Sequence, residues 1–159
     1  ARLTELDAAH PTWTHGEMVM RPLSAIARAE LVRHGYAVLG REPQSVLPAV
    51  TADDVRMAAR RELAGYWVTA ARRPWWWLDR AMIDLGLTSM ARGRHALLTG
   101  HLLTKTAAIE HADAPRWLID QMRVRRLGGD ERSPLLRSAW HAWRDARRTT
   151  ANARRRERP

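Results

Sequence analysis

Polar residues recur at helical spacing in the middle of the chain and could carry chemistry. At positions i, i+4, i+8 and i+11 stand Asp84, Thr88, Arg92 and His95. A helix would place all of these on one stripe, which could be an ordinary solvated face. Gly86, Ser89 and Gly93 on the same helix are small enough to let another helix approach closely. A helix with close neighbours exposes little of its surface to solvent. We therefore expect the polar stripe to face a cleft.

Lys105 is the single lysine among 27 basic residues. It follows Thr104, a residue type that caps helices, and therefore falls in the first turn of a predicted helix. The helix dipole disfavours a cation at this end unless an anion lies between them. Free backbone N–H groups, a hydroxyl and an ammonium group together suit a phosphate. Lys105 is thus predicted to bind phosphate, with an ordinary surface lysine as the alternative.

Three consecutive tryptophans, Trp75–Trp77, come just before Asp79. Consecutive residues of a helix point about 100° apart, so at least one of the rings must face away from the core. An exposed ring beside Asp79 could hold a cationic or sugar-like ligand by stacking and charge. Core packing is the alternative, and we expect it for two of the three rings.

The elements that must position these residues follow from proline, glycine and capping residues. Short strands are expected at 17–20 and 36–39, on either side of a helix at 25–34 that ends in a left-handed Gly35. Residues 41–50 hold two prolines and are predicted to be a linker. Helices are then expected at 51–73, 75–99 and 104–112, followed by one from Pro115 to Gly128 and one from Ser133.

The predicted fold is therefore mainly α, with a five-helix, bundle-like domain at 51–143. A short α/β segment precedes it at 1–40, and a basic tail follows at 144–159. The chain has 159 residues, a hydrophobic fraction of 45% and a mean hydropathy of −0.46, which suits one globular domain with a fragment of another. It has no run of 18 apolar residues and no signal-peptide segment, so we expect a cytoplasmic protein.

Several kinds of site are not expected. The absence of cysteine excludes disulfides and thiolate metal sites. The sequence contains no Walker-type phosphate loop, no G-x-S-x-G and no H-E-x-x-H. His101 and His111 are too far apart for one helix face, so a zinc site is not predicted either.

The net charge of +10 is unevenly distributed. Residues 144–159 contain seven arginines against one aspartate and one glutamate, which leaves +5 on this stretch. Such a tail could be a frayed, solvated helix end, or it could neutralise the phosphates of a nucleic acid. The second interpretation gives an alternative function for the chain, a basic helical nucleic-acid-binding module without catalysis.

Four segments together resemble the C-terminal helical domain of the aminoglycoside 3''-adenylyltransferases. These segments are Trp75–Asp79, Leu87–Arg92, His95–Gly100 and Thr104–Ala108. The most specific piece is the pattern T-G-x-x-x-[ST]-K, which ends at Lys105. Residues 34–40 look like that family's passage between domains, and residues 10–20 look like its last catalytic strand. The resemblance covers most of residues 10–128.

The resemblance implies a nucleotidyltransferase that binds ATP with Mg²⁺ between an N-terminal catalytic domain and this helical one. AMP would be transferred to a hydroxyl of an aminoglycoside, a reaction that confers antibiotic resistance. Glu17 would act as general base on the attacking hydroxyl. Arg92 and Lys105 would hold the triphosphate, with Arg126 near the nucleotide. The residues that would hold the drug's ammonium groups and rings are Trp77, Asp79 and Asp84.

The sequence also departs from the family's pattern. The family's metal site is a Gly-Ser turn followed by Asp-x-Asp, and this sequence contains no Asp-x-Asp. Glu17 alone cannot hold the magnesium ions that such a transfer needs, so we expect the 159 residues by themselves to be inactive. Either the catalytic domain lies outside this sequence or the chemistry has been lost. A positive net charge repels polycationic aminoglycosides, although local carboxylates can override that repulsion. A nucleotidyltransferase relative whose target is a protein or a tRNA is a third alternative, which would use the same phosphate residues.

Overall fold

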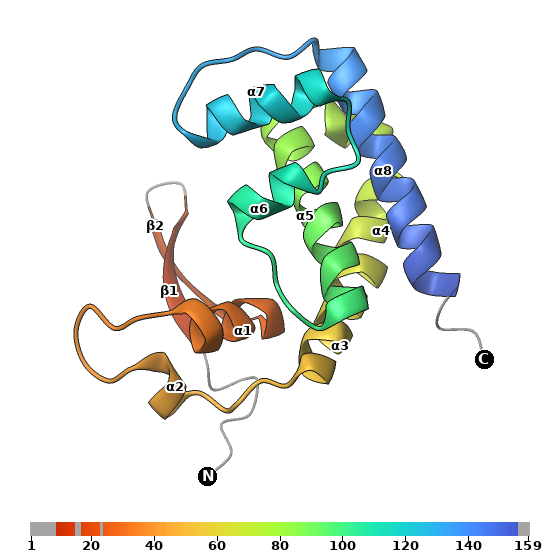
Figure 1. Cartoon of the computed structure of the whole chain (residues 1–159). Coiled ribbons are helices and arrows are strands. Elements are labelled where there is room, and N and C mark those ends of the chain that lie inside the picture. The colour runs from red at the N-terminus through yellow and green to blue at the C-terminus, as the bar shows by residue number, and fades with distance from the viewer. Residues whose placement is uncertain (1–8, 15–16, 23, 156–159) are drawn as a thin grey trace.

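The computed structural model describes residues 9–14, 17–22 and 24–155, and within them the chain is mainly helical (Figure 1). The N-terminal elements are the strands β1 (Ala9–Thr14) and β2 (Glu17–Pro22) and the helices α1 (Ala25–His34) and α2 (Pro43–Val46). The remaining elements are α3 (Ala52–Ala64), α4 (Tyr66–Ala71), the 3-10 helix η1 (Pro74–Leu78), α5 (Arg80–Thr99), α6 (Lys105–Glu110), α7 (Arg116–Arg126) and α8 (Leu135–Arg155). None of the described helices combines the length and the apolar character that crossing a bilayer requires.

Helix α5 is the central element, and α3, α6, α8 and η1 all pack against it (Figure 1). Its buried face includes Ile83, Leu87 and Met90, which join one hydrophobic cluster with side chains from α3, α4, α7 and α8. Helix α1 packs on α3, and α7 packs on α6. The polar stripe of α5 lies on the side opposite this core, as the helical period requires.

Gly86 is the position on α5 where a side chain would not fit. A Cβ atom there would lie 2.2 Å from Cζ3 of Trp77, whose ring is completely buried. Gly93, about two turns further along, faces Leu63 of α3 at 3.1 Å in the same way. The prediction that small residues allow close approach is confirmed, although at Gly86 the approaching group is a tryptophan ring rather than a second helix.

The capping residues of the sequence are confirmed at several helix ends. Thr51 and Asp54 form a capping box, and the Thr104 hydroxyl accepts a hydrogen bond from the Ala107 N–H at 3.1 Å. Gly100 ends α5 in the left-handed conformation with φ of 71°. Gly35 ends α1 at φ of −73° instead, so the predicted left-handed cap there is wrong.

Three predicted elements are wrong. Residues 36–39 form no strand and are largely exposed, because no described strand lies beside them to pair with. The helix expected at 51–73 is broken at Gly65 into α3 and α4. The helix expected from residue 75 begins only at Arg80, since Pro74 opens a 3-10 turn and the Asp79 side chain caps α5 by accepting from the Ala81 N–H at 3.2 Å.

Residues 144–155 are the second half of α8 rather than a frayed tail. Their inward face buries Asp145, Ala146, Thr149 and Ala153 against the rest of the molecule. Residues 156–159, the end of the predicted tail, lie outside the described residues. A charge run of this kind is typical of a solvated end, but here successive turns also supply small side chains that pack.

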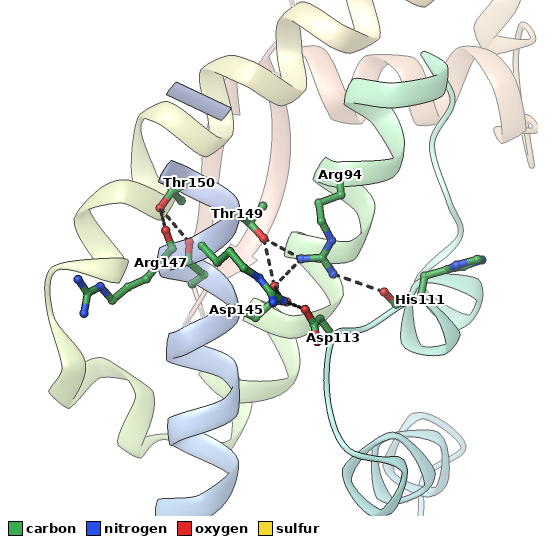
Figure 2. A network of polar contacts seen from close by, with 9 residues as sticks. Arg94, His111, Asp113, Asp145, Arg147, Thr149 and Thr150 are labelled. Atoms are coloured by element: carbon green, nitrogen blue, oxygen red, sulfur yellow. Dashed lines mark hydrogen bonds and ion pairs between the residues drawn. The ribbon is translucent and has the colours of Figure 1, made fainter. Parts of the chain in front are cut away.

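A partly buried ion pair joins α5 to α8 (Figure 2). The Arg94 guanidinium donates to Asp145 Oδ1, to the Thr149 hydroxyl at 2.7 Å and to the His111 carbonyl at 3.4 Å. Burial raises the pKa of Asp145, and the bonds from Arg94 and Thr149 oppose that rise by favouring the charged form. Asp145 is only 1% exposed, so its charged form is stabilised by Arg94 in place of water.

We expect Asp145→Ala to lower the free energy of unfolding by about 3 kcal/mol, because it leaves the Arg94 charge without its buried partner. Urea denaturation followed by tryptophan fluorescence measures the change. Asp113→Ala is the matched control, since it removes an aspartate whose ion pair with Arg148 is largely exposed and should cost less than about 1 kcal/mol. Equal losses in the two variants would contradict this account of Asp145.

Candidate functional site

A cleft of about 290 Å³ lies where α5, α6 and α7 meet. Ile109 of α6 and Met122 of α7 supply buried apolar side chains to it, and Thr88 and Ser89 of α5 supply hydroxyls. The charged residues that line it are Asp84, Arg92, Lys105, Arg125 and Arg126. Four of these were predicted site residues, far apart in the sequence, and the fold brings them to one place.

Arg92 is held in position by two contacts on opposite sides. Its Nε donates to the Leu103 carbonyl at 2.9 Å, and its Nη2 forms an ion pair with Glu30 of α1. The first contact fixes the loop that leads into α6, and the second ties α1 to α5. Arg92 therefore enters the cleft as a positioned and partly neutralised cation.

Asp84 forms an ion pair with Arg125 of α7. Arg125 Nε lies 2.7 Å from Asp84 Oδ2, and Nη2 lies 2.7 Å from Oδ1, which is the bidentate geometry of a strong ion pair. Both carboxylate oxygens are engaged, so Asp84 has little capacity to hold a ligand's ammonium group. Asp84 bridges α5 and α7, and its expected role in binding a substrate stays a prediction.

Arg125 also fixes the segment that follows α7. Its Nη1 donates to the Ser133 hydroxyl at 2.9 Å and to the Glu131 carbonyl at 3.0 Å. On the neighbouring turn, Arg123 forms an ion pair with Glu110 of α6, and this hydrogen bond lowers the pKa of Glu110. Helix α7 is thus attached by arginines to both of the other helices that line the cleft.

Lys105 and Arg126 are the cations of the cleft that have no carboxylate partner among the residues that the structure describes. Both are exposed, and they come from α6 and α7 respectively. Asp84 neutralises Arg125 and Glu30 neutralises Arg92, so these two charges are the excess. A cleft with an excess of cations, two hydroxyls and an apolar floor favours an anionic ligand such as a phosphate group.

The other predicted site residues do not reach this cleft. Trp77 is 0% exposed and donates its Nε1 hydrogen to the Ala70 carbonyl at 3.0 Å, so its ring belongs to the core and cannot stack on a substrate. Asp79 caps the start of α5 and lies outside the cleft lining. Glu17 is exposed at the start of β2, opposite Thr14, and is likewise not among the lining residues. His95 of the predicted stripe lies beside His111 instead.

In the described part of the chain, no cluster of three or more histidine, cysteine, aspartate or glutamate side chains is placed to hold a metal ion. The carboxylates nearest to the cleft, Asp84 and Glu30, are both ion-paired with arginines. These residues do not fit a magnesium site.

Comparison of the chain with protein-family models, with curated proteins and with solved structures gives no match. The assignment of the cleft as a candidate site therefore rests on the geometry and charge of its residues alone. Sequence reasoning missed Glu30 and Arg125, the two residues that neutralise and hold the others. Arg125 stands next to the predicted Arg126, but the sequence gives no sign that its partner is 41 positions away.

We expect Arg125→Ala to loosen α7 from α5, because Asp84 and Ser133 both lose their charged partner. Hydrogen exchange of the α7 amides should become faster, and the free energy of unfolding should fall by about 1 to 3 kcal/mol. The nearby Arg116→Ala is the control, since its ion pair with Asp120 is largely exposed. Unchanged exchange in α7 after Arg125→Ala would mean that apolar packing alone holds the cleft together.

Proposed function

We propose that this chain is the nucleotide-binding helical part of a nucleotidyltransferase that transfers AMP from ATP to a hydroxyl of an aminoglycoside-like acceptor. The observation that supports it best is the convergence of Arg92, Lys105 and Arg126, from three helices, on one cleft. Those are the residues that the resemblance to the aminoglycoside 3''-adenylyltransferases assigns to the nucleotide.

The charge of the cleft suits the phosphates of a nucleotide. In nucleotidyl transfer the protein's main task is to position the phosphates and to neutralise their charge. Lys105 and Arg126 are free to make charge-assisted hydrogen bonds, and Arg92 is already fixed in place by Leu103 and Glu30. At about 290 Å³ the cleft is at the small end of the range for ligand pockets, so it would take the phosphate chain rather than a whole nucleotide.

The remaining parts of the proposal depend on the resemblance. A catalytic domain with its magnesium site and a base in the position of Glu17 would come from outside the cleft described here. The acceptor is the least supported part, because Trp77 is buried and Asp84 is paired with Arg125. Asp79 is exposed and remains the candidate for an ammonium group of the acceptor.

We expect Lys105→Ala and Arg126→Ala each to weaken the binding of ATP by about tenfold or more, since each removes a charge-assisted hydrogen bond to a phosphate. Isothermal titration calorimetry of the 159-residue chain measures the affinity. Arg132→Ala is the matched control, because Arg132 is an exposed arginine outside the cleft. Inorganic tripolyphosphate should compete with ATP for the same site.

Unchanged ATP affinity in both variants would contradict the placement of the phosphates. Failure of the unaltered chain to bind either ATP or tripolyphosphate would contradict the proposed function itself. The alternative function, a nucleic-acid-binding module without catalysis, would then be the better explanation of the positive charge.

A further inference from the structure

Helix α8 carries a second feature that the nucleotide cleft does not use. Leu136, Trp140, Trp143 and Arg147 recur at i, i+4, i+7 and i+11 and form a stripe along one edge of the exposed side, where Trp143 is partly buried against the core. Leu136 is 73% exposed and Trp140 is 54% exposed. Helix α8 lies along the outside of the helical domain (Figure 1). None of its residues lines the nucleotide cleft.

Trp143 is fixed by a hydrogen bond and lies beside an arginine, and the exposed ring of Trp140 lies next to it. Trp143 donates its Nε1 hydrogen to the Ala71 carbonyl at 2.9 Å, and its ring lies 5.5 Å from that of Trp140. The Arg147 guanidinium carbon is 4.9 Å from the centre of the Trp143 ring. Two residues after Ala71, Arg73 makes a similar contact with Trp76 at 4.7 Å. The Trp140 ring therefore offers a ligand a large, half-exposed aromatic surface beside a ring that is held in place.

The exposed side of α8 has no negative charge. The single carboxylate of the helix is Asp145, which is buried and bonded to Arg94. Arg137, Arg144 and Arg147 are exposed and have no ion pair among the described residues. Their effect on a neighbour is consistent with a positive surface, because burial and the charges of Arg144 and Arg137 together lower the pKa of His141. We call the six residues Leu136, Arg137, Trp140, Trp143, Arg144 and Arg147 the α8 face.

We propose that the α8 face binds single-stranded nucleic acid, with a base stacked on Trp140 and the arginines on the phosphates. Proteins that bind single strands without strong sequence preference combine these two features, aromatic platforms and cationic side chains along the backbone. An acidic peptide could form ion pairs with the arginines, but it lacks a planar group in each residue that could stack on Trp140. A membrane surface calls for a broad apolar stripe, and the exposed apolar residues here are few. This inference is independent of the proposed function, because the face and the cleft share no residue.

The test is fluorescence anisotropy of a labelled oligouridylate of about 12 nucleotides, within the range of known single-strand site sizes, with the whole chain. We expect binding that weakens as salt is added, with Trp140→Leu reducing the affinity by about tenfold or more and Trp140→Phe retaining most of it. Leucine keeps an apolar side chain but has no ring, so the pair separates stacking from hydrophobic contact. Tyr36→Leu is the matched control, since it removes an exposed ring elsewhere.

Charge is tested in the same assay. Arg144→Gln with Arg147→Gln should reduce the slope of log affinity against log salt by about 0.7 for each phosphate that is no longer neutralised, whereas Arg132→Gln should not change it. Lys105→Ala should leave the affinity for the oligonucleotide unchanged, and a weaker affinity in that variant would place the binding in the nucleotide cleft and overturn the proposal. Affinity that is insensitive to Trp140→Leu would also overturn it. So would binding of poly-glutamate or of phosphatidylglycerol vesicles, but not of oligouridylate, through the same residues.

Discussion

The close contact between Gly86 and the buried ring of Trp77 determines how the rest of the helical domain is arranged. Because the ring lies against the backbone of α5, that helix presents its apolar side to the core and its polar stripe to α6 and α7. The same contact fixes η1, and with it Asp79 at the start of α5. A methyl group at position 86 would push the ring out of a close-packed interior and shift both elements.

Arginine has two different uses around the cleft. Arg92 and Arg125 are each engaged with a carboxylate and a backbone carbonyl, so they connect helices and have much of their charge neutralised by a partner. Lys105 and Arg126 have no such partner in the described part of the chain and keep their charge for a ligand. The carboxylates paired with Arg92 and Arg125 lower the repulsion between the four cations of the cleft. The same two arginines hold the helices that carry Lys105 and Arg126 in place.

Sequence reasoning predicted what depends on neighbours in the chain. The caps at Thr51 and Thr104, the end of α5 at Gly100 and the polar stripe of α5 all follow from local chemistry and the helical period. Some errors occurred where a distant partner decides the outcome, whereas the mistaken cap at Gly35 and the helix breaks at Gly65 and Pro74 are local. Asp84 resembles a free ligand-binding carboxylate until Arg125 is seen beside it, and Trp77 could be exposed until Gly86 admits its ring. Residues 144–155 are typical of a solvated tail by charge, yet their small side chains and Asp145 pack against α5.

The distribution of charge limits what the two exposed surfaces can bind. The cleft keeps two unpaired cations, and the α8 face keeps three, while the carboxylates close to them are buried or ion-paired. Both surfaces therefore favour anions, and neither offers a free carboxylate to a polycation. Under the proposed function, a polycationic acceptor would need carboxylates other than Asp84, which lines the cleft and is paired with Arg125. An excess of unpaired cations is thus what the described residues offer a ligand, and it suits the proposed phosphates better than the proposed acceptor.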